Sequence, residues 1–73
     1  MDLQFYSNVA FIRWVAFTEQ EPPLYAGNLL IAWEGRTRVG WYQNHTKLWW
    51  FSATDAVDNG VTHWAEIPKP PSA

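Results

Sequence analysis

Segment 29–42 constrains the fold of this chain most strongly, because two apolar runs meet there at a tight turn. The first run is apolar throughout and reads as a strand, in which Leu29, Ile31 and Trp33 share one face while Leu30 and Ala32 share the other. Gly35 follows and can adopt the positive φ of a hairpin turn. The second run, residues 38–42, then returns. The pattern predicts an antiparallel hairpin in which the Trp33 face lies near Val39 and Trp41.

Three further segments have strand character. Residues 48–51 form a short run with aromatic side chains on both faces. Residues 3–17 are largely apolar and rich in aromatic and β-branched side chains, which favours a strand; a helix remains the alternative. Residues 61–67 alternate and end at Pro68, which cannot donate to a ladder. In that last segment one predicted face contains Val61, His63, Ala65 and Ile67, and the other Thr62, Trp64 and Glu66.

Polar loops separate these segments. Residues 18–23 end in Pro22-Pro23, and residues 44–47 suit a turn. Residues 52–60 contain the loop-forming set Asp55, Asp58, Asn59 and Gly60. We therefore expect an all-β fold: one small domain over residues 1–73, built on an antiparallel sheet or meander of about four to five strands with a Trp-rich core, and a proline-rich tail at residues 68–73.

The aromatic content indicates a binding role. A chain of 73 residues buries only about 60% of its unfolded surface. It contains no Cys for disulfides, but six Trp, four Phe and three Tyr, each able to bury about 150–250 Å². Such a small domain can hardly enclose all of these rings. Some should remain on the surface, where apolar side chains often mark interfaces.

The charge pattern narrows the class of partner. The net charge is −2, and the sequence has no basic stripe of the kind that nucleic-acid-binding domains carry. No apolar run approaches the roughly 20 residues of a membrane span. The first residues lack the basic start and apolar core of a secretory signal. We therefore expect a cytoplasmic protein that does not contact membranes.

The run Val61-Thr62-His63-Trp64-Ala65-Glu66-Ile67-Pro68-Lys69-Pro70-Pro71 resembles the C-terminal signature of a family of short bacterial and phage proteins, domain-of-unknown-function family 551. Members typically end in Val-Thr-His-Trp-Met-Pro-Leu-Pro-x-Pro-Pro. Earlier motifs are similar in order, so the resemblance spans residues 14–71: Trp14, Pro22-Pro23, 27–31, 39–42 and Trp49-Trp50. Ala65 and Glu66 depart from the usual Met and Pro. The resemblance implies a small phage or prophage-encoded protein and no assigned activity.

No group of residues suggests catalysis. The only imidazoles, His45 and His63, match no metal-site spacing with the nearby carboxylates, and a catalytic zinc generally takes three protein ligands. Thr62 and His63 lack a nucleophile elbow or an oxyanion loop. Asp58-Asn59-Gly60 lacks the ligand spacing of a calcium loop. We expect no enzymatic activity, no metal and no cofactor.

Aromatic residues near two turns are the candidate binding site. Trp49 and Trp50 are adjacent, so in a strand they point to opposite faces and one is excluded from the core. The candidate set combines rings with cations: Trp41, Tyr42, Trp49, Trp50, Arg36, Arg38 and Lys47. We expect these residues to bind a host or phage protein. One concrete form of this function is inhibition of a host defence or regulatory complex. Alternatives are single-stranded nucleic acid, stacked on the rings, and a homo-oligomer packed through them.

The proline tail has two interpretations. Pro68-Lys69-Pro70-Pro71 has Pro-x-x-Pro spacing and favours polyproline II, which is a ligand conformation for other proteins. We prefer a structural role, in which Pro68 or Pro70 lies over a ring such as Trp64 and fixes the tail.

Overall fold

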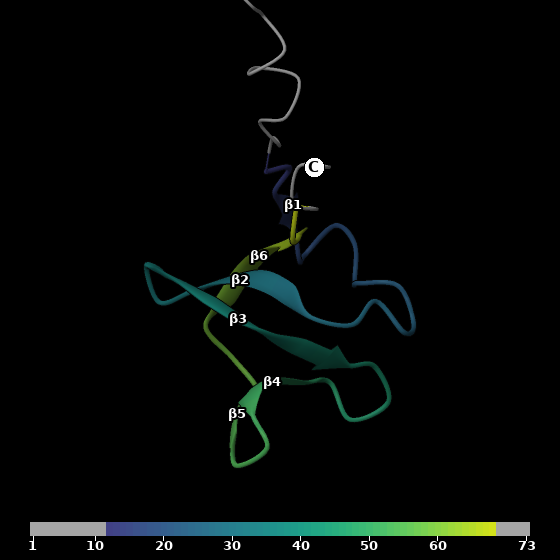
Figure 1. Cartoon of the computed structure of the whole chain (residues 1–73), viewed down its shortest axis with the longest axis vertical. Helices are drawn as coiled ribbons and strands as arrows, with labels where there is room; N and C mark the ends of the chain where they lie inside the picture. The colour runs from purple at the N-terminus through teal and green to yellow at the C-terminus, as the bar shows by residue number, and fades with distance from the viewer. Residues whose placement is uncertain (1–11, 69–73) are drawn as a thin grey trace, which may run out of the picture.

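The computed structural model describes residues 12–68, which form one antiparallel sheet of six strands and contain no helix (Figure 1). The order across the sheet is β1-β6-β2-β3-β4-β5. The strands are β1 (Val15–Ala16), β2 (Leu29–Trp33), β3 (Arg36–Gln43), β4 (Leu48–Ser52), β5 (Asp55–Val57) and β6 (Val61–Glu66). The all-β, antiparallel prediction is confirmed.

Two strands differ from the sequence prediction: β5 was not predicted, and β1 is shorter than predicted. β5 lies inside segment 52–60, which was predicted to be a loop; a bulged register pairs Ser52 with Asp55 and lets the chain turn straight back along β4. In the segment 3–17, strand structure is limited to Val15–Ala16 within the described part, and residues 1–11 lie outside it. β5 raises the count from the expected four to five to six, because β1 lies in a segment that was already predicted to be a strand.

The central hairpin of β2 and β3 is confirmed, but its predicted faces were wrong. Glu34 and Gly35 both have positive φ, 49° and 76°, so the turn has two residues and pairs Trp33 with Arg36. Directly paired residues share a face of the sheet. Trp33 therefore lies on the face of Arg36 and Arg38, whereas Val39 and Trp41 lie on the opposite face.

The inner face of the sheet encloses an aromatic core. Its buried members come from four strands: Leu29, Ile31, Tyr42, Trp49 and Trp64. Partly covered side chains pack around them: Val15, Phe17, Trp33, Phe51, Val57 and Val61. Phe17 meets the Tyr42 and Trp49 rings edge-on at centroid distances of 5.3 and 5.1 Å. A Trp-rich core is thus present, with Trp49 and Trp64 at its centre.

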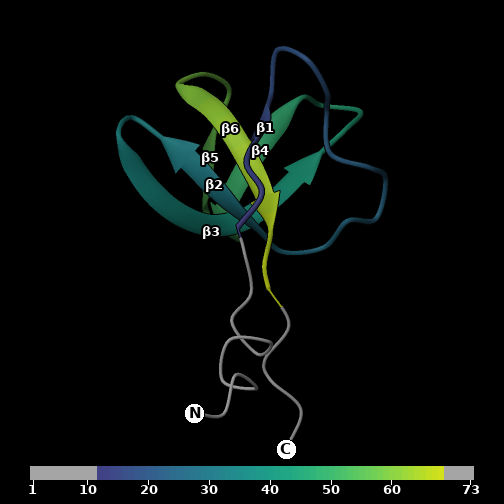
Figure 2. The ribbon, with the colours of Figure 1, turned by 90° about the horizontal axis from the view of Figure 1, so that it is seen from above.

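The sheet curls because β3 changes partner halfway along its length. Residues 36–40 pair with β2, and Trp41–Gln43 pair with β4. Gly40 lies at the change, where a Cβ would collide with the backbone carbonyl of Trp50 and approach the Ile31 side chain. Figure 2 shows β3 curving between its two neighbours. This close approach requires glycine.

Because of a bulge near the start of β6, one residue of this strand lies on the opposite face from the one predicted. The register shifts between Ala32 and Trp33 of β2, which pair with His63 and Val61. Val61 therefore joins Trp64 on the inner face instead of sharing a face with His63, which is exposed. Trp64 is buried, as a core role requires, and its Nε1 donates to the Gln20 carbonyl at 2.8 Å. Pro68 is half-buried, and the predicted contact of Pro70 with a ring lies outside the described residues.

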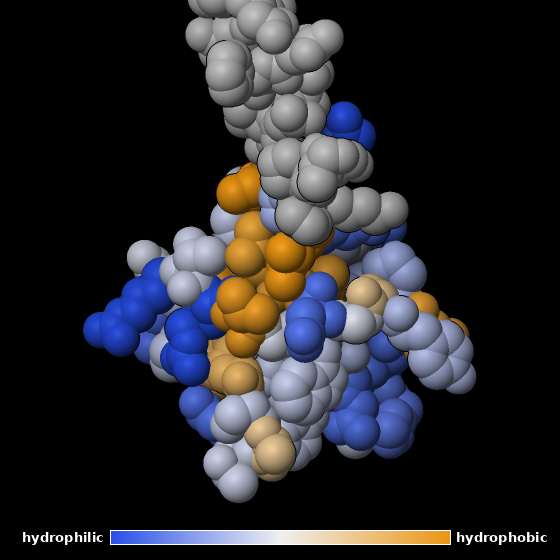
Figure 3. Space-filling view, viewed as in Figure 1, coloured by the Kyte–Doolittle hydropathy of each residue, from blue (hydrophilic) through white to orange (hydrophobic). Residues whose placement is uncertain are grey.

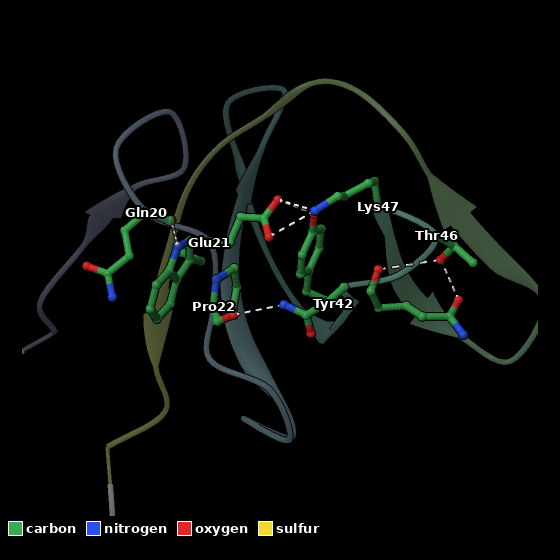
Figure 4. A network of polar contacts seen from close by, with 9 residues as sticks. Gln20, Glu21, Pro22, Tyr42, Thr46 and Lys47 are labelled. Carbon is green, nitrogen blue, oxygen red and sulfur yellow. Dashed lines mark hydrogen bonds and ion pairs between the residues drawn. The ribbon is translucent and has the colours of Figure 1, made fainter.

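The loop between β1 and β2 is held against the sheet by polar contacts (Figure 4). The Tyr42 hydroxyl donates to Glu21 at 3.1 Å, and Lys47 Nζ lies 2.8 Å from the same carboxylate. Asn44 Nδ2 donates to the carbonyl of the buried Pro22 at 3.0 Å. The hydrogen bond from Lys47 lowers the pKa of Glu21, and burial together with the Glu21 contact raises the pKa of Tyr42 to about 12. The loop thereby covers one end of the core.

Candidate protein-binding face

The outer face of the sheet consists of the strand side chains directed away from the core. The paired registers connect Leu30 with Val39 and Ala65, and Trp41 with Trp50. With alternation along each strand, these pairs define the outer face. Its strand positions are Ala16, Leu30, Ala32, Thr37, Val39, Trp41, Gln43, Leu48, Trp50, Ala56, His63 and Ala65.

The outer face is mostly apolar, and its strand positions within residues 12–68 include no Asp, Glu, Lys or Arg. A solvated face of an antiparallel sheet is normally polar, with alternation between apolar and polar side chains along each strand. Here most outer-face positions are apolar although the core lies on the other face, as in a sheet covered on both sides.

Trp41 and Trp50 form the aromatic part of this face. Their ring planes are 8° apart with centroids separated by 6.2 Å, so they lie parallel across β3 and β4. Trp50 Nε1 donates to Gln43 Oε1 at 3.1 Å, and the same oxygen accepts from the Thr46 hydroxyl at 2.7 Å. These bonds fix the half-buried Trp50 ring beside Trp41, whose exposed fraction is 37%.

Aliphatic side chains extend the aromatic pair across the sheet. Val39 is 51% exposed and lies two residues from Trp41 on the same strand face. Leu30 lies beside Val39 on β2 and is half-buried. Figure 3 shows hydrophobic side chains gathered in a band over β6, β2 and β3. The sequence pattern singled out Trp41 and Trp50 as site residues but missed Val39 and Leu30, which the hairpin register pairs on the outer face.

The predicted aromatic site is divided by the sheet. Trp50 and Trp41 lie on the outer face, whereas Tyr42 and Trp49 pair with each other on the inner face. Trp49 is 1% exposed, and Tyr42 is buried against it with ring centroids 4.6 Å apart. As expected, Trp49 and Trp50 point to opposite faces. Tyr42 and Trp49 are core residues and are removed from the candidate site.

The predicted cations do not accompany the outer rings. Arg38 lies on the inner-face side, with its guanidinium 4.2 Å from the Phe51 ring centroid and 3.5 Å from Asp55. Lys47 pairs with Glu21. Arg36 is exposed beside the β2–β3 turn, on the face of Trp33. The expected combination of stacked rings with flanking cations is therefore not assembled.

A metal site and a membrane-spanning helix are both absent from the described residues. Within 12–68, no three His, Cys, Asp or Glu side chains gather in a way that could hold a metal ion. Both His45 and His63 are exposed, and the nearest polar contact of His63 is the hydroxyl of Thr62 at 3.0 Å. Among the same residues there is no helix of the length and apolarity needed to cross a membrane.

The comparisons with known proteins add no relative to this description. No family model matches the sequence, and no curated protein or solved structure is significantly similar to it. The resemblance to domain-of-unknown-function family 551 stays a prediction based on the residues quoted for it.

Proposed function

We propose that this chain is a non-enzymatic binding protein whose outer face binds an apolar surface of another protein. The observation that carries the proposal is the uncharged outer face with the Trp41–Trp50 pair at one end and Val39 beside it. Fully buried parts of protein interfaces are depleted of charged residues and enriched in aromatic ones. This face has that composition while the rings remain accessible.

The geometry also supports a preorganised contact. Trp50 is held by Gln43, and Trp41 stacks on it, so both rings lie in fixed orientations on neighbouring strands. A partner then orders few side chains of this chain when it binds, which reduces the entropic cost of association. Trp residues in such positions frequently dominate the binding free energy.

The partner in this proposal is a host or phage protein in the cytoplasm. This part rests on the family resemblance, which implies a phage or prophage origin. Binding through this outer face would act by covering a surface of the partner, so inhibition of a host defence or regulatory complex follows from occlusion alone. No catalytic step is needed for that mode of action.

A nucleic-acid partner fits the outer face less well. Single-stranded nucleic acid needs cations along its backbone as well as stacking rings. The strand positions around Trp41 and Trp50 contain none, and Arg38 and Lys47 are engaged with Asp55 and Glu21. A protein contact requires only the apolar surface that is present.

The test combines affinity capture from a lysate of the natural bacterial host with mapping of the bound surface. The wild type is compared with Trp41→Ala and Val39→Asp, and with Tyr25→Ala as a control that removes an exposed ring of the loop between β1 and β2. We expect a protein that the wild type and Tyr25→Ala retain in both 0.15 M and 1 M salt. Both outer-face variants should lose it.

Amide chemical shifts recorded with the purified partner then locate the contact. Changes should concentrate at Leu30, Val39, Trp41 and Trp50. Retention of the partner by Val39→Asp, or shift changes confined to the loops, would refute the proposal. Sedimentation velocity distinguishes a homo-oligomer from binding of another protein. If the wild type is a dimer and Val39→Asp is a monomer, the outer face binds a second copy of this chain instead.

A further inference from the structure

The loop between β5 and β6 contains Asp58-Asn59-Gly60 and takes no part in the outer face. Asn59 and Gly60 are both exposed. In an Asn-Gly dipeptide the backbone nitrogen of the second residue can attack the asparagine side chain, since glycine has no side chain to hinder the approach. Asparagine is one of the thermolabile residues of proteins. The chemistry open to this loop is therefore deamidation of Asn59.

Two hydrogen bonds fix the backbone of this dipeptide against the end of β2. Trp33 Nε1 donates to the Asn59 carbonyl at 3.1 Å, and the Glu34 amide donates to the Gly60 carbonyl at 3.3 Å. The groups that react in deamidation are different ones, the Asn59 side-chain amide and the Gly60 backbone nitrogen. Neither makes a hydrogen bond to another residue of the described range 12–68. The contacts that hold the loop thus leave the reacting groups open to water.

The fold requires glycine at position 60 but does not require asparagine at position 59. Gly60 has a φ of 90°, and a Cβ there would lie 2.9 Å from Trp33 Nε1. A side chain at this position would strain the backbone and displace the indole. Asn59 contributes only its backbone carbonyl to the contacts of the described residues, and every residue has that group. The packing on Trp33 therefore keeps an unhindered nitrogen next to Asn59.

We propose that Asn59 is a deamidation site in the folded chain. The Gly60 nitrogen gives its proton to water or hydroxide and attacks Asn59 Cγ. A bond forms between this nitrogen and Cγ while the bond from Cγ to Nδ2 breaks, and ammonia leaves. Water then opens the resulting cyclic succinimide. Opening at Cγ gives aspartate, and opening at the Asn59 backbone carbonyl gives isoaspartate. Each conversion consumes one water and releases one ammonia, so no other reactant is needed.

The two products differ in their effect on the loop. Aspartate keeps the backbone and adds one negative charge to the net charge of −2. Isoaspartate adds the same charge but carries the main chain through the former side chain, which inserts an extra carbon between the Asn59 Cα and the Gly60 nitrogen. Trp33 and Glu34 can then no longer hold both ends of the dipeptide in their present positions. The isoaspartate form should therefore unfold at a lower urea concentration than the aspartate form.

The test is peptide mapping by mass spectrometry after the folded full chain has been incubated at mildly alkaline pH. Trypsin cleavage after Lys47 releases a peptide that contains Asn59 as its only Asn and contains no Gln. A change in mass from amide to acid in this peptide therefore identifies the site, and chromatography separates the aspartate and isoaspartate forms. We expect both forms to accumulate. Asn28 and Asn44, which are followed by residues larger than glycine, are internal controls and should remain largely unchanged.

Two variants test the route of the reaction. Asn59→Gln would have to form a larger ring, so the mass change should disappear. Tyr42→Phe removes the hydrogen bond to Glu21 at a distance from this loop and should raise the unfolded fraction about fivefold. Since the reaction is assigned to the folded chain, Tyr42→Phe should deamidate at the wild-type rate.

Three results would overturn this assignment. Deamidation of Asn59 no faster than that of Asn28 and Asn44 would show that the loop protects it. Aspartate without isoaspartate would indicate direct hydrolysis of the side chain, without attack by the Gly60 nitrogen. A rate that rises about fivefold in Tyr42→Phe would place the reaction in the unfolded chain. The proposed function does not depend on this site, because Val39→Asp should abolish partner binding and leave the deamidation rate unchanged.

Discussion

Trp41 and Trp50 lie opposite each other on β3 and β4 with their ring planes 8° apart, while Trp49, the neighbour of Trp50, points into the core. One dipeptide thus supplies a core residue and a surface residue. The two roles differ in what each ring contributes to folding and to recognition.

Alanine substitution should separate these roles. Trp49→Ala removes a ring that is 1% exposed and should lower the free energy of unfolding by about 3–5 kcal/mol. Trp41→Ala removes a 37% exposed ring and mainly its stacking on Trp50, which corresponds to about 1 kcal/mol. Urea denaturation followed by fluorescence measures both. Equal losses for the two variants would contradict the division into core and surface.

The sequence predicted the strands better than the faces. The apolar run 29–33 and the turn at Gly35 indicated the hairpin, because both are local properties of the chain. The side of the sheet that Val39 and Trp41 occupy depends on a turn of two residues, since a shift of one residue reverses every face. The bulge that separates Val61 from His63 has the same effect in β6. Neither detail has a signal in the composition.

The candidate site was predictable only in part for the same reason. A strand places Trp49 and Trp50 on opposite faces, so one exposed ring was expected. The pairing of β3 with β4 places Trp50 on the outer face. It also leaves Arg38 on the inner face over the Phe51 ring, away from Trp50. Both facts follow from contacts between different strands. Local patterns do not encode such pairings.

The two buried indoles differ in their hydrogen bonding, and conservative substitution should reveal it. Trp64 Nε1 donates to the Gln20 carbonyl, whereas Trp49 Nε1 is buried without a partner among the described residues. Phenylalanine removes similar volume at both sites. Only Trp64→Phe also loses a hydrogen bond, while Trp49→Phe relieves an unsatisfied donor. Trp64→Phe should therefore be less stable than Trp49→Phe by about 1 kcal/mol, measured from urea denaturation midpoints. The reverse order would indicate that Trp49 Nε1 has a partner.

Gly40 should tolerate no side chain. A Cβ there would collide with the Trp50 carbonyl, and relief requires that β4 move away from β3. Gly40→Ala should therefore cost at least about 3 kcal/mol, at the upper end of overpacking effects. Gly35→Ala is the matched control, because its Cβ meets no atom within 4 Å and only its φ of 76° is strained, at about 1–2 kcal/mol. Thermal unfolding of both variants checks the order; a Gly40→Ala protein as stable as Gly35→Ala would contradict the close crossing.

Stability should fall at both ends of the pH range through the contact between Tyr42 and Glu21. The pKa of Glu21 is lowered from 4.5 in the folded chain, so its contribution is present above pH 4.5 and is lost as the pH falls through the folded value. The pKa of Tyr42 is raised from 10.0 to about 12, so the folded state keeps a proton that the unfolded state releases. Its contribution is present below pH 10.0 and is lost as the pH rises toward about 12.

Two variants test which residue causes the loss of stability at acid pH and which causes the loss at alkaline pH. Tyr42→Phe keeps the core ring and removes the hydroxyl, so it should cost about 1 kcal/mol at pH 7 and reduce the alkaline loss. Glu21→Gln removes the carboxylate that Lys47 and Tyr42 both contact and should reduce the acid loss. Denaturation midpoints measured from pH 3 to pH 12 provide the curves. If Tyr42→Phe loses as much stability at alkaline pH as the wild type, a group other than the Tyr42 hydroxyl titrates in that range.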